Sequence, residues 1–95
     1  MVLTFEIDKI QPGQYRAIAT VRGGAVTEPG IYSKIHEAIR KEAEAVPEGF
    51  AHFGEVHYGG MSNGTYPLQE VVEKAPEIAD RLMWLVAKSH ELDGR

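Results

Sequence analysis

The sequence predicts a small α+β domain in which an antiparallel sheet of three or four strands carries two helices on one face. Apolar and polar residues alternate in the N-terminal third, which is typical of half-buried strands, and apolar residues recur every three or four positions in two later segments, which is typical of amphipathic helices. The chain has 95 residues, so we expect residues 1–95 to form a single domain. The predicted order of elements is β-β-(β)-α-β-α, with both helices covering the apolar face of the sheet.

The first two strands are expected to form a β-hairpin. One alternating stretch runs from Leu3 to Asp8 and the other from Tyr15 to Arg22. A Pro-Gly pair lies between them, and a two-residue loop of this composition has the wrong twist for a tight hairpin. We therefore expect a three-residue loop, residues 12–14, which places Phe5 opposite Val21 and puts the apolar side chains of both strands on one face.

The middle of the chain predicts a short strand, a helix and a further strand. Residues 25–27 follow a Gly-Gly break and are expected to form the short strand. Residues 31–46 place most of their apolar side chains on one arc of a helix, which Pro47 then ends. The next strand is expected at residues 50–58, and residues 59–65 are expected to form a loop.

The C-terminal segment has a helical pattern that continues across a proline. Pro76 should break or kink a helix, yet the apolar residues before and after it fall on the same arc. We favour a single helix over residues 67–91, kinked near Pro76. The alternative is a short first helix followed by a second helix that starts at Pro76.

Composition argues against several classes of protein. The chain has no cysteine, which excludes disulfides, thiol nucleophiles and sulfur-ligated metal sites. The net charge of −4 argues against a nucleic-acid-binding protein, which normally carries a basic face. Residues 1–8 have neither a basic start nor a continuous apolar run, so we expect no membrane association and a cytoplasmic protein.

The four histidines do not predict a metal site. His52 and His57 are five residues apart in a predicted strand, so their side chains point to opposite faces of the sheet. Glu55 and His57 share a face, but two ligands are too few for zinc. We expect no metal and no cofactor.

The polar face of the predicted sheet is the first candidate site. Carboxylate, guanidinium and imidazole groups there could carry out general acid–base chemistry or bind a small anion, and the exposed face of an ordinary sheet has the same composition. His57 is the best candidate base, because its ordinary pKa lies nearest neutrality. Gly59 and Gly60 begin a loop that we expect to lead into a helix N-terminus, which favours anions. The candidates on or beside this face are Glu6, Asp8, Arg16, Arg22, Glu55, His57, Gly59 and Gly60.

Two further residues stand out by their position on the predicted helices. Glu42 projects into the apolar arc of the first helix, so it is either solvated beyond the sheet edge or an acid that faces a pocket. Trp84 lies on the polar face of the last helix, near Arg81 and Lys88. A large aromatic side chain in that position is typical of an interface, although a cation stacked on its ring is a simpler explanation.

The function that the sequence favours is a non-catalytic binding or protein-interaction domain that acts as a homo-oligomer, above all a homodimer. Its interface would contain Trp84, with Arg81 and Lys88 at the rim. The alternative is a small acid–base enzyme or small-anion-binding protein. That alternative requires a concave pocket in which at least two of four side chains converge, namely Arg16, Glu42, Glu55 and His57. The sequence identifies neither a ligand nor a substrate.

Overall fold

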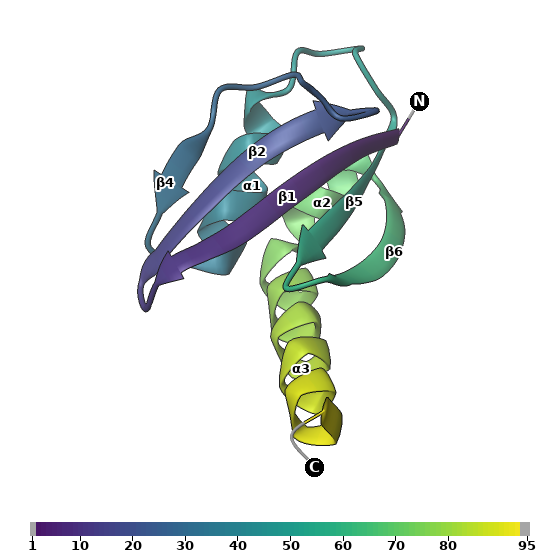
Figure 1. The fold of residues 1–95 in the computed structure, drawn as a ribbon. Helices are drawn as coiled ribbons and strands as arrows, with labels where there is room; N and C mark the ends of the chain where they lie inside the picture. The colour runs from purple at the N-terminus through teal and green to yellow at the C-terminus, as the bar shows by residue number, and fades with distance from the viewer. Residues whose placement is uncertain (1, 94–95) are drawn as a thin grey trace.

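In the part of the chain that the structure describes, six strands form one mixed sheet and three helices lie against one of its faces (Figure 1). The structure is a computed structural model and describes residues 2–93. The strands are β1 (Val2–Gln11), β2 (Gln14–Val21), β3 (Gly24–Ala25), β4 (Gly30–Tyr32), β5 (Phe53–Tyr58) and β6 (Met61–Pro67). The helices are α1 (Ile35–Ala45), α2 (Leu68–Glu73) and α3 (Ala75–Asp93). The α+β class is therefore as predicted.

The prediction of an antiparallel sheet with three or four strands is wrong, because β1 and β5 are parallel neighbours. The strand order is β3-β2-β1-β5-β6, and β4 also pairs with β2. The chain reaches this arrangement because β4 is antiparallel to β2 and so runs in the direction of β1. Helix α1 then returns the chain behind the sheet, and β5 starts at the end where β1 starts. Alternation reports which face a residue lies on but not the direction of its neighbouring strand.

The hairpin between β1 and β2 has a tighter loop than predicted. Phe5 pairs with Ala19 instead of Val21, a shift of two residues that leaves every side chain on its predicted face. The loop consists of the two residues 12–13, and Gly13 has a φ of 76°. An irregularity in the register between Lys9 and Gln11 accompanies this loop. Such a bulge increases the local twist of the strands. The increased twist allows the two-residue Pro-Gly loop, which was not expected from the sequence.

Four other elements differ from the prediction. Helix α1 begins at Ile35, because residues 30–32 pair with β2 as β4 and do not continue the helix. The fifth strand begins at residue 53 and the third covers residues 24–25. Most of the predicted loop at residues 59–65 belongs to strand β6, which pairs with β5. Its largely polar sequence lacks the alternation that predicts a strand.

The C-terminal segment forms two helices, so the single kinked helix that we favoured is wrong. Lys74 separates α2 from α3, and Pro76 lies in the first turn of α3, where a missing N–H is tolerated. The amide of Lys74 bonds to Glu70 O at 2.8 Å, and the amide of Ile78 bonds to Lys74 O at 2.9 Å. This nearly continuous ladder of hydrogen bonds explains why the apolar residues before and after Pro76 fall on the same arc of the helix.

The hydrophobic core lies between the sheet and the helices. The predicted polarity of the hairpin is confirmed, because Phe5, Ile7 and Ala19 are buried while Glu6 and Arg16 are exposed. Core side chains come from β1, β2 and β5 on one side and from all three helices on the other. The largest fully buried residues are Leu3, Phe5, Ile39, Val56, Val71, Ile78 and Leu82.

We predict that Gly54→Ala destabilises the domain by about 1–3 kcal/mol through overpacking. A Cβ atom at Gly54 would lie 2.7 Å from Cε2 of Phe5, which is completely buried in the core. Urea unfolding monitored by circular dichroism measures the change. The control is Gly24→Ala in β3, where the nearest atom to a new Cβ is Val21 O at 3.4 Å. Equal stability of the two variants would contradict this packing.

Candidate functional site

Glu42 of α1 is buried and bonded to two hydroxyl groups. Its side chain is 3% exposed. Thr27 donates to Oε1 at 2.6 Å, and the Tyr32 hydroxyl donates to Oε2 at 2.6 Å. The carboxyl group is therefore neither solvated beyond the sheet edge nor facing an open pocket, the two possibilities considered from the sequence.

Thr27 connects this carboxyl group to the edge of the sheet. The amide of Ala19 donates to Thr27 Oγ1 at 2.9 Å, while Ala19 O accepts from the amide of Val26 at 2.8 Å. The Thr27 hydroxyl thus accepts a hydrogen bond in place of a strand carbonyl in the gap between β3 and β4, and it donates its own hydrogen bond to Glu42. Strand β2, the β3–β4 connection and α1 are held together by one hydrogen-bonded group, which makes Glu42 a structural residue.

The Tyr32 hydroxyl is the titratable group most affected by this arrangement. Burial, followed by the hydrogen bond to Glu42 and the charge of Glu42, raises the pKa of Tyr32 to about 12, from an ordinary value of 10.0. The Tyr32 hydroxyl therefore stays protonated, and continues to donate to Glu42, well above the pH at which an unfolded chain releases this proton.

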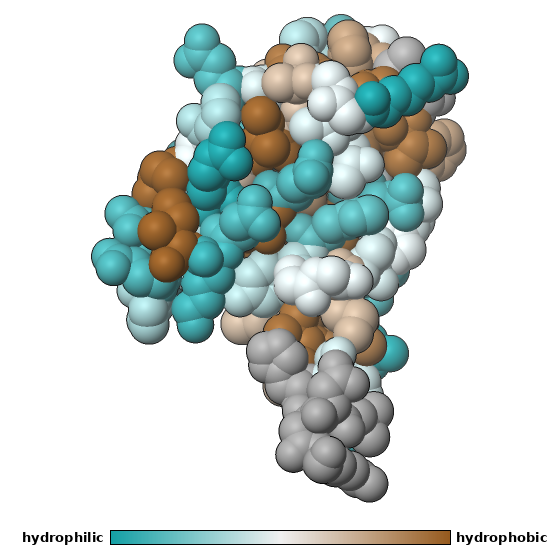
Figure 2. Space-filling model, in the orientation of Figure 1, coloured by the Kyte–Doolittle hydropathy of each residue, from teal (hydrophilic) through white to brown (hydrophobic). Residues whose placement is uncertain are grey.

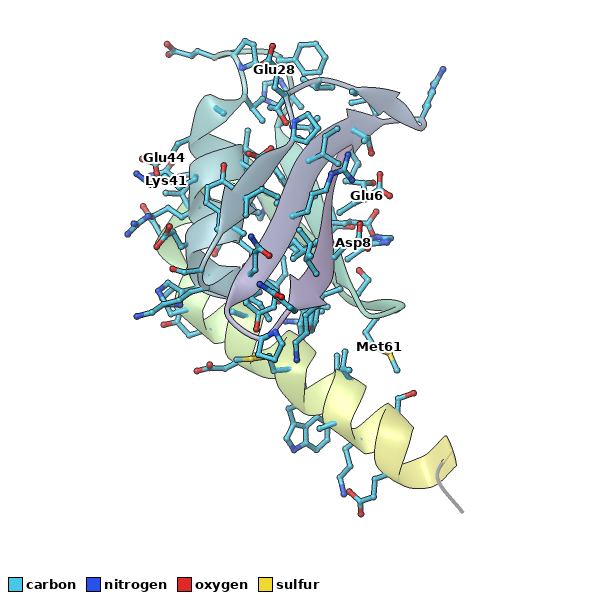
Figure 3. The ribbon with its side chains drawn as sticks, turned by 60° about the vertical axis from the view of Figure 1, so that its left-hand side comes forward. Glu6, Asp8, Glu28, Lys41, Glu44 and Met61 are labelled. Atoms are coloured by element: carbon cyan, nitrogen blue, oxygen red, sulfur yellow. The ribbon has the colours of Figure 1, made fainter. Side chains whose placement is uncertain are left out.

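The candidate residues of the polar sheet face share that face but do not all converge. His57 of β5 is the register partner of Glu6 in β1, whereas Arg16 lies on β2, on the far side of β1. Two strand spacings separate Arg16 from His57 by at least about 10 Å. Arg22 follows the end of β2, with a φ of 52°, and is exposed. In Figure 3, Glu6 and Asp8 lie on the side of the molecule opposite the outer surface of α1.

A polar cavity of about 180 Å³ lies where β5 turns into β6, and it contains some of these candidates. Its polar lining consists of Glu6, Asp8, His57 and Tyr58, beside the backbone of residues 59–60. Those two glycines form the β5–β6 turn and do not lead into a helix N-terminus, so that expectation is wrong. Two carboxyl groups near an imidazole can exchange protons with a solute, but they disfavour an anion.

A second cavity, of about 240 Å³, was not suggested by the sequence. It lies between the start of α1 and the middle of α3, and its lining is Tyr15, Ser33, Lys34, Ile35, His36, Ala79 and Met83. These residues come from three separate parts of the chain, so no motif marks them. Across residues 2–93, neither of the two cavities brings together two of Arg16, Glu42, Glu55 and His57.

The outward face of α3 displays Trp84. The indole is 51% exposed, and the Arg81 guanidinium carbon lies 5.1 Å from the centroid of its ring system. Lys88 forms an ion pair with Glu91 at 3.5 Å, one turn further along. The opposite side of α3 is buried, with Ile78 among its core residues. Figure 1 shows α3 continuing well past the end of the sheet, so this face is not covered by another element.

The outer face of the sheet is a poorer candidate for a docking surface. Figure 2 shows hydrophilic side chains across the middle of the sheet and separate hydrophobic areas nearer its margins. The exposed apolar residues lie at separate places on this face: Ile31 is on β4, whereas Phe53 on β5 pairs with Val2 on β1. The single tryptophan of the chain lies on α3 and not on this face.

Two further properties follow from the described residues. No group of three or more histidine, aspartate and glutamate side chains within them is arranged to hold a metal ion. None of the helices in this part of the chain is long and apolar enough to cross a membrane. The structure does not describe the side chain of His90.

Comparisons with protein-family models, with curated proteins and with solved structures find no match to this chain. The candidate sites are therefore distinguished by their geometry and by the chemistry of their side chains.

We predict that Thr27→Val destabilises the domain by about 2–3 kcal/mol. Valine has nearly the shape of threonine, but it leaves the Ala19 amide and Oε1 of Glu42 without their partner. Chemical denaturation measures the loss. Thr65→Val on β6 is the control, because Thr65 is exposed, and its effect should stay within about 0.5 kcal/mol. A neutral Thr27→Val would show that the hydrogen-bonded group does not stabilise the fold.

A second prediction concerns alkaline pH. The Tyr32 pKa is about 12 in the folded chain and about 10 in the unfolded chain, so its contribution to stability is complete below pH 10 and is lost as the pH rises to about 12. The free energy of unfolding should therefore fall more steeply in the wild type than in Tyr32→Phe over this range. Denaturation curves at successive pH values test this, and parallel pH profiles for the two proteins would contradict it.

Proposed function

We propose that this chain is a small non-catalytic interaction domain that works as a homodimer, with the exposed face of α3 as its interface. The observation that carries the proposal is the position of Trp84, which is half-exposed on a helix whose other side already fills the core. About half of Trp84 is left in solvent within the single chain, and indole groups are enriched at protein interfaces.

The shape of the chain supports an interface on α3. The domain measures 45 × 24 × 23 Å, and its long direction follows α3 beyond the sheet (Figure 1). Met83 and Trp84 are 44% and 51% exposed on this helix. Burial of the exposed indole against a second copy would contribute about 2 kcal/mol per chain. Stability margins in domains of this size are small, so this is a large contribution.

The placement of the polar candidates supports a non-catalytic role. Glu42 is bonded to hydroxyl groups inside the fold, and Arg16 is separated from His57 by β1. Of the four side chains named for an acid–base enzyme, His57 lines the polar cavity without the other three. An enzyme that depends on their convergence is therefore the less favoured alternative.

We predict that the wild type sediments as a dimer and that Trp84→Ala weakens association by at least about thirtyfold, as expected for the loss of about 2 kcal/mol or more of apolar burial. Trp84 is the only tryptophan in the chain, so its emission should shift to the red when the dimer dissociates on dilution.

The matched control for this experiment is Phe53→Ala. Phe53 is a comparably exposed aromatic residue, at 44%, but it lies on β5 and outside α3. This variant should remain dimeric. A wild type that sediments as a monomer at high concentration would overturn the proposal, as would a dimer that Trp84→Ala leaves unchanged.

A further inference from the structure

We infer that two copies of this chain associate with their α3 helices antiparallel, in one register set by the outward residues of that helix. The inference rests on the proposed homodimer and adds the orientation and the contacts of the second copy. It depends on six exposed positions, here called the α3 seam: Lys74, Glu77, Arg81, Trp84, Lys88 and Glu91.

The α3 seam has the spacing of a helix–helix contact. Its successive members are three, four, three, four and three residues apart, which keeps them in one line along the helix. All six are exposed, whereas Ala75, Ile78 and Leu82, which lie on the other side of the helix, are buried in the core. The line is therefore exposed along its whole length, although Lys74 is already ion-paired with Glu70 of its own chain at 3.0 Å. Lys74 continues the line because the hydrogen-bond ladder passes through that residue.

The spacing of the seam determines how a second helix can match it. The six positions are symmetric about a point between Leu82 and Met83. When a second copy runs antiparallel about that point, every seam position faces another seam position. The resulting pairs are Lys74 with Glu91, Glu77 with Lys88, and Arg81 with Trp84, and the two-fold axis forms each of them twice.

The chemistry of these pairs is complementary, although the spacing of the seam alone determines the register. Two of the three pairs join a cation to a carboxylate. The third places the Arg81 guanidinium against an indole, a contact that Arg81 already makes with Trp84 in its own chain, at 5.1 Å. Lys88, which is bonded to its own Glu91 at 3.5 Å, would gain Glu77 of the second copy as another partner.

Two other arrangements of the same helices are electrostatically poorer. A parallel pair in register would place Glu77 against Glu77 and Lys88 against Lys88. An antiparallel pair centred on Trp84 would place Glu77 against Glu91. Like charges in contact oppose association and exclude wrong alignments, so the charges of the seam favour the register that its spacing selects.

A single pair of helices gives a small interface. Stable dimers bury about 800 Å² on each partner, and one helix of about 28 Å offers less than that. The dimer should therefore dissociate on dilution, and added salt should weaken it because most of its pairs are exposed ions.

Charge reversal at one pair of the seam tests the register. In the antiparallel arrangement, Glu77→Lys places a lysine opposite Lys88 of the second copy at both ends of the helix pair. Lys88→Glu likewise places two glutamates opposite each other. Each single variant should weaken the dimer by about tenfold or more at low salt. The double variant Glu77→Lys/Lys88→Glu restores opposite charges and should recover association to within about threefold of the wild type. An equimolar mixture of the two single variants should form a heterodimer.

The measurement is sedimentation velocity over a concentration series, with circular dichroism to confirm that each variant is folded. Glu44→Lys is the matched control. It makes the same change of net charge as Glu77→Lys, but on the exposed surface of α1, where Figure 3 labels it, and it should leave the dimer unchanged.

The possible outcomes distinguish this inference from the proposed homodimer on which it rests. A monomeric wild type overturns both. A dimer that Trp84→Ala dissociates, but that both single charge reversals leave intact, keeps the interface on α3 and overturns the antiparallel register. A double variant that does not recover association, while remaining folded, also overturns the register.

Discussion

The fold depends on the carboxyl group of Glu42, which the structure buries between the sheet and α1. A buried carboxyl group is costly unless its oxygens are hydrogen-bonded, and here the Thr27 and Tyr32 hydroxyls meet that requirement. Both donors come from the segment that carries the chain from β3 to α1. The start of α1, and with it the crossover that delivers β5 beside β1, is thereby tied to the edge of β2. Among the described residues no buried side-chain nitrogen or oxygen lacks a partner, so this polar group is complete.

Sequence patterns predicted which face each residue occupies but not how the strands are connected. Alternation assigned Phe5 and Ala19 to the core correctly, because the period of a strand depends only on local geometry. The direction of β5 depends on the path of α1 through space, which no local pattern contains. Strand β6 was missed because residues 62–65 are polar or glycine, so that its pairing with β5 comes from tertiary contact and not from propensity.

For the candidate sites too, local patterns were predicted from the sequence and tertiary contacts were not. The angular position of Trp84 on a helix was sufficient to predict its exposure, and Arg81 beside it follows from helical spacing. The partners of Glu42 lie ten and fifteen residues away, in a connection without regular spacing, so the sequence identified an unusual carboxyl group without identifying its donors. The cavity between α1 and α3 is assembled from separate parts of the chain, and no sequence pattern marks it.

The parallel pairing of β1 with β5 has a consequence for how the chain folds during synthesis. Val2 pairs with Phe53, so one edge of the central strand has no partner until the second half of the chain has emerged from the ribosome. The first hairpin can form early from local contacts, but its apolar face stays uncovered until the helices follow. Non-local pairing of this kind slows folding and leaves a strand edge open to other chains. Nascent chains are therefore most prone to aggregate in the interval between completion of β2 and arrival of β5.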